Sequence, residues 1–481
     1  MLGTLSKPSV HAWLDPRLVP PRSPELLRRL LAKPLGRTGA TSGRTSPALR
    51  RGRAHLANLA ALFATSLAGV SAGRKAYKGA GRSFQRHLRL AALPRPSVTD
   101  PLRSIESAKR YFGLGNKVVE QLGPARAEDL ERELADNFEF VAPYVGPLPK
   151  AALIAATTGL DLGEGLPDFN ARYHGFRVDP INPRRVWCQM RVVATHTGVL
   201  RFAGITAEPK DPPERTESPP EAVSITFNEA GQVREITTGY PLDRRCGTTG
   251  GLGGLFGILE GVGCPLPPFL TRTVGELLPP ALRQSGAGEP EEQVTLPVLT
   301  SVDALPEDEL LKLTEQLIAA QLGVQDPSLL SDSFSFTGPV PGVLRKADFL
   351  EAKSSIDLLG AFPDLDHQYR DLRTCPFDVN RVWFTSSPSG THKAALRVGG
   401  QVLAPTGKQW RSPPVCGSMQ FDRHGKCIAM TGDYPMDRRM GNTKGLPGLM
   451  GLLEALGSPS PWAWTCRTPT QLWSSLIGGS V

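Results

Sequence analysis

The chain carries one long sequence pattern twice. GYPLDRRCGTTGGLGGLFGILEGVG spans residues 239–263 and DYPMDRRMGNTKGLPGLMGLLEALG spans residues 433–457, with 15 of 25 positions identical. Just upstream, FNEAGQVREIT at 227–237 matches FDRHGKCIAMT at 421–431 at the same offset of 194 residues. A repeat of this length predicts two copies of one domain in tandem, and it must be recognised before any short motif is interpreted.

The repeat continues towards the N-terminus at an offset of 196 residues. The matching segments are RVW at 185–187 and 381–383, Thr-His at 195–196 and 391–392, and ADNFEFVAPYVG at 135–146 with SDSFSFTGPVPG at 331–342. Between the copies the chain is polar and contains Gly and Pro, which is typical of a linker. These features predict a first domain at 101–282, a linker at 283–303 and a second domain at 304–481.

Each copy begins with helical patterns and ends with strand patterns. In the second copy, Leu310, Leu313 and Leu317 recur at helical spacing. Later segments alternate in the manner of strands, and Gly231 marks a hairpin turn. Helices followed by a run of strands predict an α+β fold. We therefore expect two tandem cone-shaped domains, each with N-terminal helices packed on a curved antiparallel sheet.

Three motifs in each copy support a family resemblance. They are the Asp-x-Phe-x-Phe segment at 136–140, the RVW strand with its later Thr-His, and the Phe-x-x-x-Gly-x-Val-x-x-Ile-Thr hairpin at 227–237. Together they resemble the nuclear transport factor 2-like superfamily, particularly its SnoaL-like polyketide cyclase branch. The resemblance implies a cone with an apolar cavity and, in the cyclases, an acidic residue that acts as a base. The Tyr-Pro-x-Asp-Arg-Arg extension departs from the general pattern and resembles a tandem variant seen in algal chloroplast proteins.

The positive charge of the chain is concentrated at its N-terminus. Residues 1–99 hold 18 Lys and Arg against two acidic residues, whereas the rest holds 37 basic and 44 acidic residues. A mildly acidic body argues against nucleic-acid binding, which needs a basic patch in the folded part. SPELLRRLLAK at 23–33 is typical of a transit peptide, and the twin-arginine stretch at 50–73 resembles a thylakoid-transfer signal. We expect residues 1–95 to be a disordered targeting peptide that delivers the protein to the chloroplast stroma or the thylakoid lumen.

The sequence predicts neither a cofactor nor a metal site. Its seven cysteines form no Cys-x-x-Cys pair and no zinc-finger spacing with histidine. No nucleotide-binding fingerprint stands out, and the glycines after the Asp-Arg-Arg motif lack the Lys-Ser/Thr of a phosphate-binding loop. The mature chain also shows no apolar run long enough to suggest a transmembrane span.

Four residues are candidates for acid–base chemistry. An inward-pointing carboxylate at Asp136 or Asp332 would have a raised pKa in an apolar cavity, although the alternative is an aspartate that caps a helix or turn. His196 and His392 follow a Thr near a turn between two strands. Either histidine is suited to proton transfer near neutral pH, and the alternative is an exposed hairpin tip.

Two further sets of residues are candidates for ligand binding. Aromatic walls suit a flat hydrophobic ligand such as a pigment, polyketide or isoprenoid, although core packing is the alternative. The repeated Tyr-Pro-x-Asp-Arg-Arg motif is suited to a lid that holds a ligand carboxylate or phosphate, or to a clasp on the edge of the sheet. The aromatic candidates are Tyr173, Trp187, Tyr369 and Trp383, and the motif candidates are Tyr240, Asp243, Arg244, Arg245, Tyr434, Asp437, Arg438 and Arg439.

The leading functional hypothesis is a plastid protein that binds a hydrophobic small molecule or a protein partner. Assembly of plastid complexes and pigment or lipid metabolism are the roles that we expect for it. The alternative is a cyclase or isomerase that uses the Asp or His candidates as acid and base. The two repeats are expected to pair with each other or to form a homodimer.

Overall fold

The computed structural model describes residues 101–113, 124–143, 145–158, 162–202, 205–264, 298–339, 342–398 and 401–458. The predicted targeting peptide and most of the predicted linker lie outside these residues. No helix in the described ranges is both long and apolar enough to cross a bilayer.

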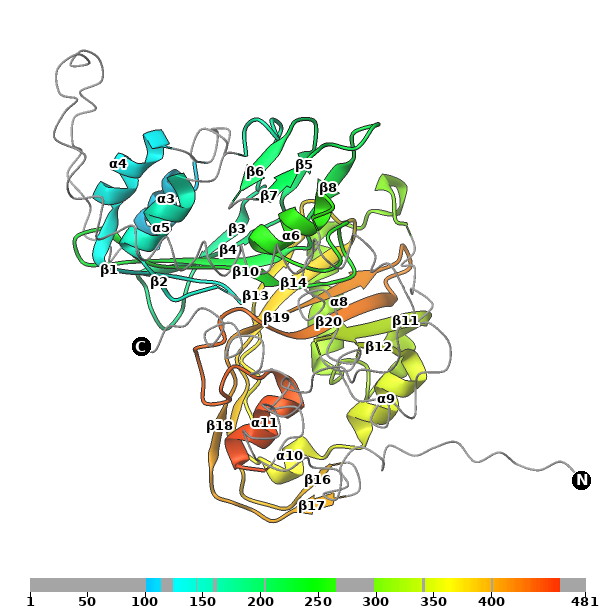
Figure 1. Ribbon diagram of the computed structural model, residues 1–481. Coiled ribbons are helices and arrows are strands. Elements are labelled where there is room, and N and C mark those ends of the chain that lie inside the picture. Colours follow the sequence, from blue (N-terminus) through cyan, green and yellow to red (C-terminus); the bar gives the residue numbers. More distant parts are fainter. Residues whose placement is uncertain are drawn as a thin grey trace, which may run out of the picture.

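The first domain consists of helices packed on one face of a six-stranded sheet, with small hairpin extensions (Figure 1). The strand order of the sheet is β2-β1-β10-β9-β4-β3. The helices are α3 (Pro101–Tyr111), α4 (Pro124–Glu133), α5 (Lys150–Thr158) and α6 (Gly254–Gly261). The strands are β1 (Leu134–Val141), β2 (Leu148–Pro149), β3 (His174–Val178), β4 (Arg185–Met190), β5 (Val193–Thr195), β6 (Leu200–Phe202), β7 (Ile205–Ala207), β8 (Arg215–Glu217), β9 (Glu221–Phe227) and β10 (Val233–Pro241).

The second domain repeats this arrangement with the strand order β12-β11-β20-β19-β14-β13. Its helices are η6 (Ser301–Asp303), α8 (Glu307–Ala319), η7 (Pro327–Leu329), α9 (Lys346–Ser354), α10 (Leu358–Ala361) and α11 (Gly448–Leu456). Its strands are β11 (Leu330–Gly338), β12 (Gly342–Arg345), β13 (Arg370–Thr374), β14 (Arg381–Ser386), β15 (Ser389–Thr391), β16 (Leu396–Val398), β17 (Gln401–Leu403), β18 (Gln409–Arg411), β19 (Val415–Phe421) and β20 (Cys427–Pro435). The predicted tandem α+β architecture is confirmed.

The sheets differ from the expected pattern at one pair of strands. β1 runs parallel to β10, with Phe140 opposite Ile236, and β11 runs parallel to β20 in the second domain. The other pairs in each sheet are antiparallel. The parallel pair arises because β1 precedes the whole meander, which returns to it along the same direction.

The central strands are buried on both faces, because each sheet lies between its own helices and the other domain. All seven residues of β9 are buried. Successive side chains of a strand point to opposite faces. Val223 and Ile225 accordingly belong to the core of the first domain, whereas Ala222 packs in a cluster shared with the second domain.

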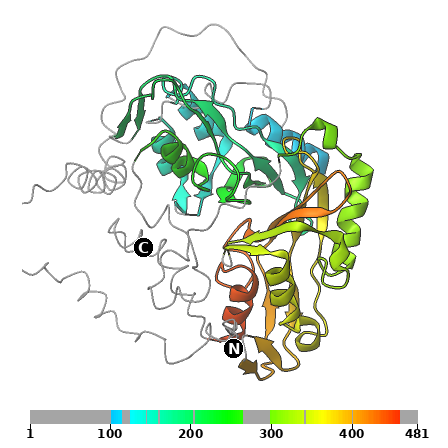
Figure 2. The same ribbon diagram turned by 90° about the vertical axis from the view of Figure 1, so that its right-hand side faces the viewer.

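The two domains meet along the sheet faces that point away from their own helices. We call these the outer faces, and the faces that pack against the helices the inner faces. One apolar cluster contains Trp187, Tyr240 and Leu242 from the first domain. The same cluster contains their counterparts Trp383, Tyr434 and Met436 from the second domain. Figure 2 shows most of the first domain above the second, with the sheets between them. We call this contact the seam, and it makes the chain an intramolecular pair of related domains.

The seam supplies the first testable prediction. Leu242 and Met436 are fully buried there, so truncating either to alanine removes packing from both domains. We expect Leu242→Ala and Met436→Ala each to lower the free energy of unfolding by about 2–5 kcal/mol. Val402→Ala, on an exposed side chain of β17, is the control and should change it by less than about 0.5 kcal/mol. Denaturant titration measures all three, and equal effects would contradict the packing described.

Candidate functional site

The repeated Asp-Arg-Arg motif of each domain reaches across the seam to the other. Arg185 of β4 donates from Nη2 to Asp437 Oδ2 at 2.7 Å. The reciprocal contact joins Arg381 Nη1 of β14 to Asp243 Oδ2 at 3.0 Å. All four side chains are almost completely buried. The Arg of each Arg-Val-Trp segment is therefore the partner of the other copy's motif.

The second arginine of each motif holds its own aspartate and extends further. Arg245 Nε donates to Asp243 Oδ1 at 3.0 Å, and its Nη1 reaches Ser335 Oγ of the second domain at 3.3 Å. The counterpart Arg439 contacts Asp437 and also Glu235 of the first domain, at 3.0 Å. Each buried carboxylate thus has two guanidinium partners from two different domains.

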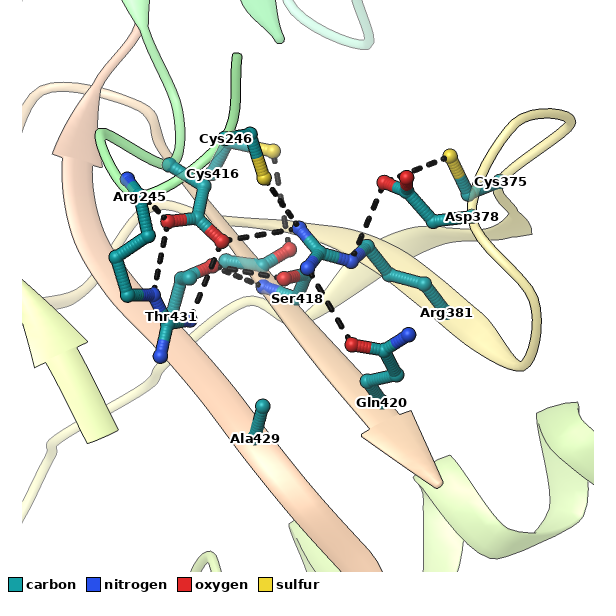
Figure 3. Close-up of polar contacts among 12 residues, drawn as sticks. Arg245, Cys246, Cys375, Asp378, Arg381, Cys416, Ser418, Gln420, Ala429 and Thr431 are labelled. Atoms are coloured by element: carbon teal, nitrogen blue, oxygen red, sulfur yellow. Dashed lines mark hydrogen bonds and ion pairs between the residues drawn. The ribbon is translucent and has the colours of Figure 1, made fainter. Parts of the chain in front are cut away.

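Arg381 shows how closely these groups are surrounded by partners (Figure 3). One end of its guanidinium faces Cys246, at 3.6 Å, and the other end faces Asp378, at 3.4 Å. Asp378 also accepts a hydrogen bond from Arg191 of the first domain at 2.7 Å. Burial alone would raise the pKa of Asp243, but Arg245 and Arg381 hold it at about 2. The charges are committed to one another rather than to solvent.

The remaining residues of the motif also serve the contact between domains. The Tyr240 hydroxyl oxygen accepts a hydrogen bond from the backbone N–H of Arg438. The Tyr434 hydroxyl oxygen accepts one from the backbone N–H of Arg244. Gly251 has a φ of +73°, and a Cβ there would lie 2.7 Å from the Arg244 Cβ. Only glycine fits such a close approach. The motif therefore forms a clasp, and it joins the two domains rather than the edge of its own sheet.

The inner face of the first domain holds a different kind of group. Glu221, the first residue of β9, is completely buried. Its Oε2 accepts from the backbone N–H of Gly254, at the start of α6, at 2.8 Å. Its Oε1 has no hydrogen-bond partner among the described residues. The nearby Ser218 hydroxyl donates instead to the carbonyl of Pro219 at 2.9 Å.

The surroundings of Glu221 favour its neutral form. Burial raises its pKa to about 7, although the Gly254 N–H and Ser218 oppose the shift. Tyr173 lies close by. The pKa of its phenol is raised by burial first and by Cys188 next, and the charge of Glu221 also contributes to this shift. The ring of Tyr173 stacks on Phe112 of the N-terminal segment at 4.4 Å between centroids. A protonatable carboxyl, a phenol and aromatic rings therefore gather on the inner face.

The second domain places a carboxylate at the same location from another strand. The repeat position of Glu221 is Val415, but Asp433 stands where the first copy has Gly239. A Cβ on Gly448, at the start of α11, would lie 2.6 Å from the Asp433 carboxylate. Asp433 also adds to the raised pKa of Tyr369, which is due first to burial. Each domain thus brings one carboxylate to the helix α6 or α11 and to its inner tyrosine.

The predicted acid–base aspartates lie elsewhere. The carboxylates of Asp136 and Asp332 are fully exposed, and they lie 3.7 Å from Lys150 and 3.4 Å from Lys346. The burial on which their proposed chemistry depended is absent. Both aspartates lie two residues before a buried phenylalanine of β1 or β11, in the irregular part of the strand where the regular pairing with β10 or β20 is interrupted.

The predicted histidines are buried rather than exposed at a hairpin tip. His196 is 3% exposed and His392 is completely buried. His392 Nδ1 accepts from the Thr406 N–H at 3.2 Å, its ring stacks on Phe362, and burial lowers its pKa. Their Nε2 atoms have no partner among the described residues. Neither histidine contacts Asp136 or Asp332 in the described contacts, so the four candidates do not form one site.

The aromatic candidates divide between two faces. Tyr173 and Tyr369 pack with the inner cores, whereas Trp187 and Trp383 belong to the seam cluster. The Trp187 indole N–H donates to Asp179 at 2.7 Å. No group of three or more His, Cys, Asp or Glu side chains that could hold a metal occurs in the described part of the chain.

Comparisons with known proteins identify no family for the chain. No family model matches it, and no curated protein matches it. Among solved structures, a protein described as a SnoaL-like polyketide cyclase from Jannaschia sp. CCS1 is 14% identical, with a TM-score of 0.24 over 33% of this chain and 98% of its own. AclR of Streptomyces galilaeus, described as a hydroxylase, is 19% identical, with a TM-score of 0.23 over 32% and 99%. A phenazine biosynthesis-related protein from Pseudomonas aeruginosa is 12% identical, with a TM-score of 0.22 over 39% and 92%.

The clasp gives a pH-dependent prediction. The pKa of Asp243 is depressed in the folded chain, so its stabilising effect is present above the unfolded value of about 3.9 and is lost as the pH falls towards 2. Asp243→Asn removes the nearer of the two carboxylates that face the buried Arg381 and leaves only Asp378, at 3.4 Å. We expect it to lower the free energy of unfolding near pH 7 by about 3–5 kcal/mol, with a smaller deficit at pH 2. Urea titrations at several pH values measure this, and a constant deficit would contradict it.

Proposed function

We propose that the first domain binds an apolar small molecule against the inner face of its sheet. The observation that carries this proposal is the unpartnered Oε1 of the buried Glu221. Since Oε2 already accepts a hydrogen bond from Gly254, a proton on the neutral carboxyl belongs on Oε1. A buried donor without an acceptor costs about 1–3 kcal/mol, which a ligand carbonyl or hydroxyl would recover.

The aromatic side chains nearby define the rest of the ligand. Tyr173 stacks on Phe112, and Phe176 lies 6.4 Å from Phe112 between centroids. Tyr173 and Phe176 are only partly buried while packing against the inner core. Such rings suit a flat hydrophobic molecule with one polar group, as in the pigment, polyketide or isoprenoid classes.

The second domain is proposed to bind a different ligand or none. Its inner polar groups are Asp433, Tyr369 and His367, and the His367 and Tyr369 rings stack at 5.3 Å. Burial lowers the pKa of His367, although Asp433 opposes this shift. An ionisable imidazole beside a carboxylate is a more polar set than Glu221 with Tyr173.

A second candidate function is proton transfer by a cyclase or isomerase. The observation that favours it is the pKa of Glu221 at about 7, which is close to the pH at which a general acid or base works best. In this hypothesis Glu221 replaces Asp136 and His196 as the acid–base group. It takes a proton from a carbon next to a ligand carbonyl and returns it elsewhere on the same molecule.

We also propose that the protein acts in a chloroplast, in plastid complex assembly or in pigment or lipid metabolism. The strongly basic, nearly acid-free composition of residues 1–99 supports import. A protein partner in the organelle is the remaining alternative to a small-molecule ligand.

Two substitutions of Glu221 separate binding from catalysis. Glutamine keeps a donor N–H2 group in place of the neutral carboxyl but cannot exchange a proton. Glu221→Gln should therefore keep the bound small molecule in protein purified from its source, whereas Glu221→Ala should lose it, as measured by mass spectrometry of the extract. A cyclase or isomerase would keep ligand but lose turnover in Glu221→Gln. Retention of the same molecule by Glu221→Ala would overturn the site.

The pH dependence of stability tests the same carboxyl without a ligand. The pKa of Glu221 is raised in the folded chain, so stability is full below the unfolded value of about 4.3 and falls as the pH rises towards 7. Glu221→Gln removes this loss, so its stability relative to the native chain should increase by about 3 kcal/mol between pH 4 and pH 8. Glu229→Gln, at an exposed carboxylate, is the control and should show no such trend.

The proposed localisation has its own test. Residues 1–95 fused to a fluorescent protein should direct it into chloroplasts of an algal or plant cell. The same segment with its arginines at 50, 51 and 53 changed to glutamine should still enter the stroma but fail to reach the lumen. A fusion that stays in the cytosol or enters mitochondria would contradict the proposal.

A further inference from the structure

The contacts across the seam are of two kinds when they are compared between the copies. The ion pairs Arg185–Asp437 and Arg381–Asp243 are equivalent, so this contact is made in both directions. Other cross-seam contacts are made in one direction only, because the equivalent residues of the other copy differ. Contacts of this second kind decide whether a domain distinguishes the other domain from a copy of itself.

One corner of the seam holds two contacts of the second kind. Arg191, which follows β4, donates from Nη1 to Asp378 Oδ1 at 2.7 Å, and both side chains are largely buried. The neighbouring Phe377 has the guanidinium of Arg172 over its ring, at 5.1 Å from the centroid. The rings of Phe377 and His174 also meet edge to face, at 5.0 Å between centroids. We call these five residues the Phe377 corner.

The equivalent corner of the seam lacks these groups. The residues that correspond to Arg191, Asp378, Arg172 and Phe377 are Ser387, Asn182, Gln368 and Ile181. Ile181 is 76% exposed, whereas Phe377 is 40% exposed. The Phe377 corner therefore joins the first domain to the second in one direction only.

Most of the other one-directional ion pairs have one partner that is common to both copies. Arg177 donates from Nε to Asp371 across the seam at 3.1 Å. Asp371 occurs only in the second domain, but its partner is an arginine in both copies, since Arg373 is the equivalent of Arg177. In a pair of second domains with the same geometry, each Asp371 would therefore still face an arginine.

The ion pair of Arg439 with Glu235, at 3.0 Å, behaves in the same way. Glu235 occurs only in the first domain, whereas its partner is an arginine in both copies, because Arg245 is the equivalent of Arg439. In a pair of first domains each Glu235 would face Arg245. Ion pairs of this kind are redistributed among like domains rather than lost, so they give no preference for unlike domains.

The Arg191–Asp378 pair differs because both of its members are replaced in the other copy. A pair of first domains would set Arg191 against Asn182, and a pair of second domains would set Asp378 against Ser387. Each would keep an ion pair within its own domain, at 2.7 Å for Arg191 and 3.4 Å for Asp378. The cross-seam pair is lost from both arrangements, and so is the aromatic contact beside it. Separating the partners of a largely buried ion pair is costly.

We infer that the Phe377 corner makes the seam specific for unlike domains. A first domain pairs with a second domain, of its own chain or of another copy, and rejects a copy of itself. Charge complementarity of this kind acts on the choice of partner more than on raw affinity. Two copies that associate through the seam therefore exchange domains and do not join like to like. The inference concerns the outer sheet faces and is independent of any ligand of the inner faces.

Cutting the chain between its domains tests this choice of partner. A protease site placed between residues 285 and 295, in the predicted linker, leaves two halves that are held together by the seam alone. Two cut preparations with different tags on their first halves are mixed, unfolded in urea and diluted together. Capture of one tag should recover second halves, with the other tag in less than about 5% of the complexes.

Matched variants identify the corner as the cause. Arg191→Ser with Asp378→Asn gives the Phe377 corner the residues that the equivalent corner already accommodates. This double variant should raise recovery of the other tag on the order of tenfold. Arg201→Ser with Glu164→Asn removes an exposed ion pair within the first domain and should leave the recovery unchanged. Random capture of both tags by the native halves, or native recovery in the Arg191→Ser and Asp378→Asn variant, overturns the inference.

The intact chain provides a second test that does not depend on reassembly of cut halves. Arg191→Ser with Asp378→Asn should lower the midpoint of thermal unfolding by about 3 °C. Asn182→Asp with Ser387→Arg builds the same ion pair at the equivalent corner. Adding these two changes should restore most of the lost midpoint, because the repeat relates the two corners. If the midpoint is not restored, the corners are not equivalent and the inference is overturned.

Discussion

The reciprocal buried ion pairs between Arg185 and Asp437 and between Arg381 and Asp243 determine how the rest of the structure is arranged. Removing one partner leaves a buried charge with less compensation, and this costs more than an exposed pair gains. The two sheets are therefore held in one register, with the aromatic residues of the seam packed between them. Each central strand consequently has two buried faces, and this explains why polar residues such as Ser224 occur in the middle of buried strands.

Sequence comparison between the copies predicted the architecture but not the partners across the seam. The repeat established the element order and the importance of the Asp-Arg-Arg motif. The repeat contains no information about the distance between the two copies. The motif was therefore interpreted within its own domain, as a lid or as a clasp on the edge of its own sheet. For Trp187 the face was undecided, since a strand buried on both sides lacks the polar alternation that identifies an inner face. Asp136 shares its parity with the buried Phe138, so the sequence predicts an inward side chain, but the irregularity of β1 between Leu134 and Glu139 leaves Asp136 exposed to solvent.

Glu221 was missed for a related reason, although the repeat contained a signal for it. Residues kept in both copies drew attention, whereas Glu221 and Asp433 each occur in one copy only. The signal was complementary: Glu with Gly in one copy, and Val with Asp in the other, at positions 221 and 239 and their equivalents. Val415 and Asp433 lie on the neighbouring strands β19 and β20, so the carboxylate of one copy is on the strand next to that of the other copy. The residues of the clasp are thus shared by both domains, whereas these two carboxylates are not.

Asp371 and Gly175 occupy the same position of the repeat, and they show what tandem fusion permits. Asp371 accepts from Arg177 Nε at 3.1 Å across the seam, whereas Gly175 has no side chain to offer the equivalent arginine, Arg373, which donates to Gln189 instead. In a homodimer with two-fold symmetry, any residue at an interface occurs twice, so an acidic partner is present for both arginines or for neither. Here the two subunits of such an assembly are encoded in one chain, and each interface position evolves separately. Joining the copies also keeps them at a high effective concentration, so one half of the contact is released from the need to be self-sufficient. Gene fusion of this kind converts a symmetric contact into an asymmetric one, in which the same arginine is held by an aspartate on one side and by a glutamine on the other.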